Sequence, residues 1–312
     1  MNYWRAYPKI SRYYTGNLHT FWIYAFLVIM TPTPTLTIAI IVALVLFGLF
    51  LYFLFRKPKE AELKPFPRRW RVILNQKVRF FRELDVEQQT RFKRRVQRFL
   101  REVKITGVDT KVSTQDKLLV AASGIIPTFG FKNWNHYPRL VEVLLYKDSF
   151  RRGDFATEGE GRDVGGMVGG GYMSGKLLLS KRALRHGFRS FGPDNTGIHE
   201  FVHLLDRADG DTDGIPEYFL DNSYLIPWVE MMRSEMEAIE RGQSDIDEYA
   251  TTNRAEFLAV VAEYFFNQPD KFAEEHPKLF ALCEHIFEQD LDEDGGIGTV
   301  HGEDLLSELA KE

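Results

Sequence analysis

The pattern of apolar and polar positions separates a short N-terminal part of the chain from a longer amphipathic part. Residues 36–55 carry no charge and are mostly Ile, Leu, Val and Phe, which is the length and composition needed to cross the hydrocarbon core of a bilayer. The alternative is a buried globular helix, but such a helix normally shows a polar residue on one side. We therefore predict one transmembrane helix at 36–55, with the lipid bilayer as its partner.

Residues 1–35 are predicted to form an N-terminal extension. Its apolar run, Phe21–Met30, is too short to span a bilayer, and no small-residue cleavage site follows it. Met30 directly precedes Thr-Pro-Thr-Pro-Thr, which favours Met30 as the true initiator and 1–29 as a mis-called upstream extension. A short hydrophobic hairpin arm is the alternative.

Flanking charge predicts the orientation of the transmembrane helix. Residues 56–75 form a basic, proline-containing juxtamembrane linker with seven Lys and Arg, against three upstream of the helix. The positive-inside rule therefore places the C-terminal side in the cytoplasm, with the linker against anionic headgroups. Cys283 is the only cysteine, which excludes an intrachain disulfide and suits a reducing compartment. The predicted location is a single-pass inner membrane protein with a cytoplasmic domain.

Residues 76–290 are predicted to form one α+β domain, mainly helical with a small sheet, followed by an acidic tail at 291–312. Apolar residues recur at helical spacing in 86–103, and further helices are expected at 114–128 and 228–241. A strand is expected at 140–146. The formal charge of −4 and the pI near 6.1 argue against nucleic acid as a partner.

A glycine-rich segment, 159–175, is interpreted as a mobile loop that leads into a second strand. A strand next to a catalytic site can pair with an extended peptide substrate. The candidate substrate-binding edge is therefore the strand formed by Leu177, Leu178, Leu179 and Ser180.

The chemistry of the chain is indicated by His199-Glu-Phe-Val-His203, an HExxH motif. Two residues four apart lie on the same face of a helix, so His199 and His203 can present two imidazole nitrogens to one metal ion. Glu200 lies about 100° around the helix, where it borders the metal without ligating it. The alternative is a core helix whose histidines are satisfied by hydrogen bonds. We predict a catalytic zinc site with Glu200 as the general base.

A catalytic zinc needs a third protein ligand, and the spacing of residues leaves several candidates. Asp209 can ligate zinc but lies in a turn-rich acidic loop. Glu256 and Glu263 share a face of a later helix about 10 Å apart along its axis, so only one of them can touch the metal. The other is expected to accept a hydrogen bond from a ligand histidine. Asp206, seven residues after His199, is another candidate acceptor, with a salt bridge or a cap as the alternative.

The sequences HEFVHLLD at 199–206 and YATTNRAEFLAVVAEYFF at 249–266 resemble the Mlc titration factor A family of zinc metallopeptidases, which typically reads HEFAHxLD and then YA…AEFFAVxSEYFF. The resemblance covers roughly 75–290, and the Tyr-x6-Glu-Phe spacing is similar to the catalytic domain of anthrax lethal factor. It implies a zincin-like (gluzincin-like) metallopeptidase domain with Glu256 as third zinc ligand. It also implies that Tyr249 donates a hydrogen bond to the developing oxyanion. Val202 and the transmembrane anchor depart from the family pattern.

The predicted function is therefore hydrolysis of peptide or protein substrates by a membrane-anchored, cytoplasm-facing zinc peptidase. The alternative is a zincin-fold module with little or no activity that sequesters a regulatory protein at the membrane. The family resemblance implies a transcription repressor as that partner. A purely structural zinc domain is disfavoured, because structural zinc sites are usually rich in cysteine.

Overall fold

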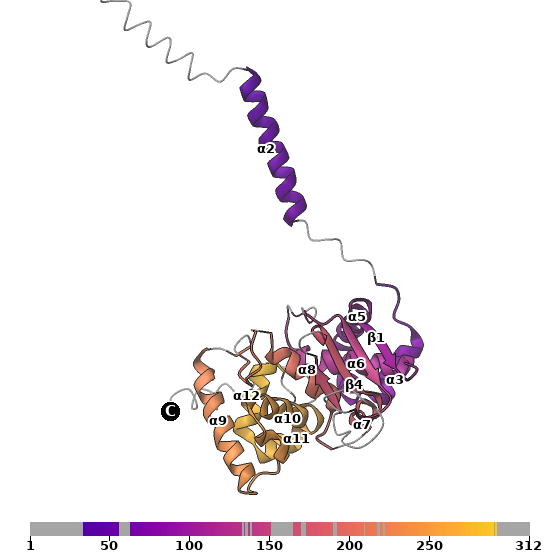
Figure 1. The fold of residues 1–312 in the computed structure, drawn as a ribbon, viewed down its shortest axis with the longest axis vertical. Coiled ribbons are helices and arrows are strands. Elements are labelled where there is room, and N and C mark those ends of the chain that lie inside the picture. Colours follow the sequence, from indigo (N-terminus) through magenta and orange to yellow (C-terminus); the bar gives the residue numbers. More distant parts are fainter. Residues whose placement is uncertain are drawn as a thin grey trace, which may run out of the picture. The chain divides into compact units, whose positions relative to one another are not determined.

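The chain divides into two compact units, 1–62 and 63–312, and each is described by itself (Figure 1). The computed structural model describes residues 34–55, 63–132, 134, 137, 139–150, 165–169, 173–189, 192–208, 210–216, 219–220, 222–289 and 291. The predictions for 1–33, for Asp209 and for the tail from 292 onward lie outside the described residues. So does most of the glycine-rich segment.

In the first unit the described residues form helix α2, Pro34–Phe55. Its 22 residues have a mean hydropathy of 3.0 in their most apolar stretch, and none of them is buried in the structure. By length and composition α2 can cross a membrane. A signal sequence near an N-terminus passes the same test.

The second unit contains a four-stranded mixed sheet among its described residues, formed by β1 (Lys104–Val108), β2 (Glu142–Tyr146), β3 (Gly166–Val168) and β4 (Lys176–Ser180). The strand order is β1-β2-β4-β3; β1, β2 and β4 are parallel, and β3 runs antiparallel to β4. The strand expected at 140–146 is thus confirmed as β2. Part of the glycine-rich segment forms β3 rather than a loop.

The domain is mostly helical, as the sequence predicts. Among the described residues, the α-helices of this unit are α3 (Arg68–Lys77), α4 (Arg79–Glu83), α5 (Val86–Glu102), α6 (Thr114–Ile125), α7 (Lys181–Gly187), α8 (Thr196–Asp206), α9 (Asn222–Glu240), α10 (Arg254–Asn267), α11 (Pro269–Glu275) and α12 (Pro277–Phe287), and short 3₁₀ helices include η1 (Ile126–Thr128) and η3 (Glu248–Thr251). Helix α3 begins inside the stretch expected to be a linker. It folds there because Leu74 is fully buried and Trp70 packs edge-on against Phe66.

Helix α8 lies at the centre of this unit. Figure 1 shows it between the sheet with its adjoining helices and the C-terminal helices α9–α12, and it packs against α6, α10 and β3. Its Phe201 is fully buried, with its ring 5.8 Å from Phe99 and 5.1 Å from Tyr137. Gly124 of α6 permits this close packing, because a Cβ there would lie 2.8 Å from the Phe201 ring. Packing from both sides therefore fixes the position of α8.

Candidate metal centre

The helix that carries the HExxH motif is started by Asn195. This N-cap residue accepts a hydrogen bond from the Ile198 N–H through its side-chain oxygen, at 3.3 Å. One turn of α8 separates His199 from His203, and both imidazoles extend from the same face. Their Nε2 atoms lie 3.1 Å apart.

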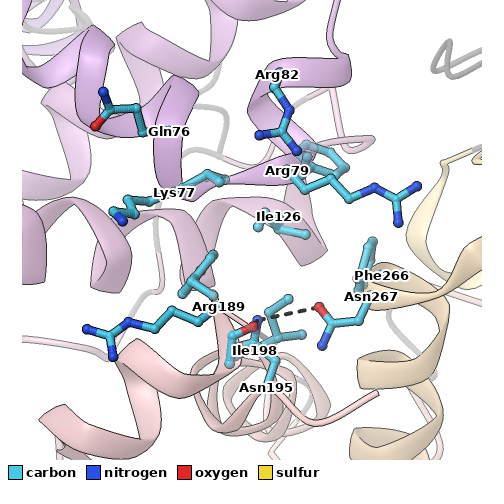
Figure 2. A pocket seen from close by; sticks show the side chains of 14 residues that line it. Gln76, Lys77, Arg79, Arg82, Ile126, Arg189, Asn195, Ile198, Phe266 and Asn267 are labelled. Atoms are coloured by element: carbon cyan, nitrogen blue, oxygen red, sulfur yellow. Dashed lines mark hydrogen bonds between the residues drawn. The ribbon is translucent and has the colours of Figure 1, made fainter. Parts of the chain in front are cut away.

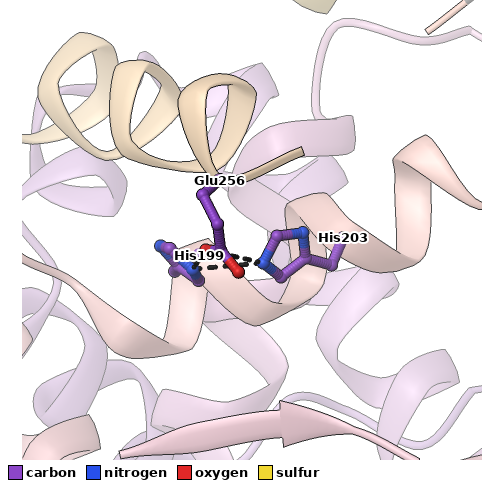
Figure 3. A group of neighbouring side chains, drawn as sticks. All are labelled: His199, His203 and Glu256. Atoms are coloured by element: carbon purple, nitrogen blue, oxygen red, sulfur yellow. Dashed lines mark hydrogen bonds and ion pairs between the residues drawn. The ribbon is translucent and has the colours of Figure 1, made fainter. Parts of the chain in front are cut away.

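Glu256 reaches the same point from α10. Asn253 caps α10 by accepting the Glu256 N–H at 3.0 Å, which places Glu256 in the first turn. Its Oε2 lies 2.9 Å from His199 Nε2 and 3.4 Å from His203 Nε2. Figure 3 shows the three side chains converging from the two helices. Among the described residues these three form a group that could hold a metal ion.

The spacing of these ligand atoms fits a tetrahedral metal. Bonds of about 2.0 Å place the ligands of a tetrahedral zinc about 3.3 Å apart, close to the separations of 2.9, 3.1 and 3.4 Å seen here. The hydrogen bonds are consistent with a metal site. When a neutral His199 donates its Nδ1–H to Glu263, its Nε2 carries a lone pair that faces a carboxylate oxygen of Glu256. A cation between these acceptors removes their repulsion. Two imidazoles and one glutamate are also a donor set of catalytic zinc sites.

Glu263 supports His199 from behind. Its Oε1 lies 2.6 Å from His199 Nδ1, and its Oε2 accepts the backbone N–H of Asn195. Burial alone would lower the pKa of His199, but the carboxylates of Glu263 and Glu256 outweigh it and hold the pKa well above its usual value. Burial likewise opposes ionisation of Glu256, and the two histidines reverse this and hold its pKa well below the usual range. The carboxylates of Glu256 and Glu263 therefore favour positive charge at His199.

Glu200 has the properties expected of a general base next to this centre. It is 6% exposed, and its Oε2 has no hydrogen-bond partner among the described residues. Burial raises its pKa above the ordinary glutamate value, a shift that the neighbouring His199 and His203 reduce. Gly166 of β3 lies against it, because a Cβ at Gly166 would be 2.4 Å from Glu200 Cγ. A raised pKa makes this carboxylate a stronger proton acceptor than an ordinary glutamate.

A cavity of about 780 Å³ opens beside these residues. His199, Glu200 and Glu263 line it, together with Gly166 and Tyr249. The Tyr249 ring lies 6.1 Å from the His199 ring, centroid to centroid. The structure therefore brings the predicted Tyr249 to the same cavity as the metal-binding group.

Two predictions about the surroundings are wrong. The strand Leu177, Leu178, Leu179 and Ser180 is not a sheet edge, because β4 pairs with β2 on one side and β3 on the other. All four residues are fully buried. Asp206 does not accept from a ligand histidine: His199 Nδ1 is held by Glu263, and His203 Nδ1 has no partner among the described residues. Asp206 instead accepts the Gly214 N–H with both oxygens, which holds the turn after α8.

Sequence reasoning missed the role of two residues. Asn195 caps α8, and nothing in the sequence indicated that its N–H would bind Glu263. Gly166 lies within a run of glycines. From the sequence alone, a glycine required by a close contact with Glu200 cannot be distinguished from a glycine of a flexible loop.

A buried HExxH helix and a glutamate from a following helix define a metallopeptidase-like module. The chain belongs to the glucose-regulated metallo-peptidase M90 family, whose sequence pattern matches residues 53–288. This confirms the resemblance inferred from the motifs.

The chain is similar to several curated proteins. It is 28% identical to a Synechocystis sp. protein described as uncharacterized, over 74% of this chain and 87% of that protein. It is 30% identical to the Mlc titration factor A of Escherichia fergusonii over 63% of this chain and 77% of that protein. It is 29% identical to the Mlc titration factor A of Enterobacter sp. over 48% of this chain, and that match spans 59% of the relative's length.

Proposed function

We propose that the chain is a zinc-dependent peptidase with a zincin-like catalytic domain, held at a membrane by α2. The observation that carries the proposal is the convergence of His199, His203 and Glu256 next to a buried, unpaired carboxylate oxygen of Glu200. A zinc ion held by these three ligands would supply Lewis acidity, polarising the scissile carbonyl and lowering the pKa of a water.

The protein side chains then carry the proton transfers. Glu200 takes a proton from the attacking water and delivers it to the leaving amine. Tyr249, at the same cavity, donates a hydrogen bond to the oxyanion that develops on the carbonyl. Glu263 keeps the His199 proton on Nδ1, so that Nε2 remains a ligand.

The edge of the sheet that serves a peptide substrate is β3. Gly165 O and Gly169 N–H are bonded to β4, so by alternation the N–H and C=O groups of Gly166 and Val168 point away from β4. No other described strand pairs with this side. A peptide extended along it would pass Gly166 and therefore Glu200, which places a scissile bond at the metal-binding group.

The substitution Glu200→Gln tests the peptidase. It keeps the size of the side chain and leaves the three metal ligands intact, so we expect full zinc stoichiometry and a loss of peptide hydrolysis of roughly 10³-fold. Glu274→Gln, at an exposed position of α11, is the matched control. The assay is cleavage of a peptide library with and without a chelator. Normal turnover in Glu200→Gln would rule out this mechanism.

The membrane location rests on the length and composition of α2 and on the seven basic residues that follow it in 56–75. We place the domain from 63 onward in the cytoplasm by the positive-inside rule. Protease protection of the domain in intact cells, with digestion only after permeabilisation of the inner membrane, checks this orientation.

A second function is favoured by the relatives named Mlc titration factor A: a module with little or no activity that binds a regulatory protein, such as a transcription repressor, at the membrane. In that case, cells that carry Glu200→Gln should behave like wild-type cells and not like cells that lack the protein. Under the peptidase proposal the same cells should behave like cells that lack the protein.

A further inference from the structure

A second pocket lies on the opposite side of the chain segment that precedes α8. Its volume is about 270 Å³, and its walls come from α3, α4, the end of α7, α8 and α10. Asn195 lines this pocket, whereas its neighbours Asp194 and Thr196 line the cavity of the metal centre. Figure 2 shows Asn195 and Asn267 on one side of the pocket, joined by a hydrogen bond, and Arg79 and Arg82 on the other.

The charged side chains that line this pocket are all basic: Lys77, Arg79, Arg82 and Arg189. None of its described lining residues is an Asp or Glu, although the whole chain carries a formal charge of −4. The cavity of the metal centre has the reverse character, with Asp194, Asp245, Asp247, Glu200 and Glu263 in its lining. The basic residues are therefore concentrated on one side of the segment.

Most of this positive charge is uncompensated within the part of the chain that the structure describes. Arg79 pairs with Glu83 at 2.5 Å and with Asp270 at 3.8 Å. Arg82 makes only a long contact, 3.5 Å to the backbone oxygen of Asn75. Lys77 and Arg189 form no salt bridge with any carboxylate in the part of the chain that the structure describes. Cations gathered around a pocket without counter-charges favour binding of an anion with several oxygens.

Part of the pocket lining is apolar. It includes Ile126, Ile198 and Phe266, together with Phe80 and Phe188. A free inorganic ion would leave the partly buried Phe80 and Phe188 in contact with water, whereas an anionic group on an apolar body covers them. The pocket lining therefore favours a ligand that has both an anionic group and an apolar body.

We propose that this pocket binds a phosphate group carried on an apolar body, with Lys77, Arg82 and Arg189 contacting the phosphate oxygens. Guanidinium and ammonium groups complement the charge and the several acceptors of a phosphate. Because α2 can cross a membrane, the headgroup of an anionic phospholipid is one source of this group. A soluble phosphate monoester is the other. The proposal does not depend on peptidase activity.

Asn195 connects this pocket structurally to the metal centre. Its side chain lines the basic pocket and its backbone N–H is held by Glu263, which in turn holds His199 Nδ1. Gly187 fixes Asn195 from the other side, since a Cβ at Gly187 would lie 2.9 Å from Asn195 Cα.

The test measures binding to the full-length protein in detergent micelles by titration calorimetry. The probes are phenyl phosphate and dihexanoyl phosphatidylglycerol, with benzyl alcohol and dihexanoyl phosphatidylcholine as ligands that lack the net negative charge. The pocket variant is Lys77→Gln with Arg82→Gln. The matched control, Lys93→Gln with Arg94→Gln, removes the same charges from α5, outside the pocket lining.

We expect at least one phosphate probe to bind the wild type and the control, and to bind the pocket variant roughly 10-fold to 100-fold more weakly. Binding of both probes identifies the phosphate group as the determinant, and binding of the lipid alone identifies the headgroup as its source. Binding of neither probe, or equal affinity in the pocket variant and the control, overturns the proposal. Circular dichroism of both variants shows whether a loss reflects unfolding.

Discussion

Glu263 joins His199 to Asn195: one carboxylate oxygen lies 2.6 Å from His199 Nδ1 and the other accepts the Asn195 N–H. The residue that supports the candidate metal ligand His199 is therefore also bonded to the cap of the helix that carries His199. The orientation of the imidazole and the start of α8 depend on the same side chain.

The substitution Glu263→Gln should weaken metal binding. An amide can accept only one of the two hydrogen bonds, and its NH₂ group then faces a second donor. Loss of such a supporting partner typically reduces metal affinity 10-fold to 100-fold, and we expect a decrease of this size. Competition with a chromogenic chelator measures it. Glu275→Gln, exposed on α11, should match the wild type, and wild-type affinity in Glu263→Gln would refute the supporting role.

The substitution Gly166→Ala should displace Glu200. The new Cβ would lie 2.4 Å from Glu200 Cγ and 2.7 Å from its Oε1, so the carboxylate must move. We expect kcat to decrease roughly 10²-fold while zinc content is unchanged, since the loss is that of a positioned general base. Gly165→Ala is the control, because its Cβ would come no closer than 3.3 Å to any atom. Equal activity of the two variants would contradict this explanation.

The substitution Tyr249→Phe removes the hydroxyl proposed to stabilise the oxyanion. Because that charge develops only in the transition state, kcat should decrease by about 10²-fold while KM changes little. Steady-state kinetics on one peptide separates the two constants. Tyr224→Phe, whose ring packs on His285, should behave as the wild type. A rise in KM alone would assign Tyr249 to substrate binding instead.

Asp245 should contribute to stability in a pH-dependent way. Partial burial opposes its ionisation, but hydrogen bonds from Lys271, Tyr264 and His276 outweigh it and lower its pKa to about 2. A carboxyl whose pKa is lowered on folding stabilises the fold above its unfolded value, and this contribution is lost as the pH falls through the folded value.

The variant Asp245→Asn should therefore be less stable than the wild type at pH 7, by about 1 kcal/mol after solvent screening of this half-exposed group. The difference should shrink as the pH falls from about 4 towards 2. Thermal unfolding at several pH values measures it. Asp270→Asn, at a more exposed acid in a longer ion pair, should show little difference at any pH. A difference for Asp245→Asn that persists unchanged at low pH would exclude the ionic origin.

The spacing of residues in the sequence was sufficient to predict geometry within one helix. It was insufficient to predict how two helices lie relative to each other. It predicted that His199 and His203 share a helix face and that only one of Glu256 and Glu263 reaches the metal-binding group. It could not choose between those two glutamates, because the choice depends on how α10 crosses α8. In the structure Glu256 faces the Nε2 atoms and Glu263 faces Nδ1.

The sheet shows the same limit. The apolar run in β4 predicted a strand, but a strand buried on both faces has the same composition whether it is central or at an edge. Its partner β3 has only three residues. Gly166 and Met167 have little strand propensity, so the sequence did not predict a strand there. The sequence therefore could not indicate which strand forms the edge of the sheet.

The candidate metal ligands come from two helices, α8 and α10, separated by roughly fifty residues of chain. An ion held by both would act as a removable cross-link that closes this long loop, so its binding energy would also resist separation of the two helices. Chelation would then do more than stop a reaction. It would loosen the attachment of the C-terminal helices, and susceptibility of 210–250 to proteolysis would report whether the ion is present.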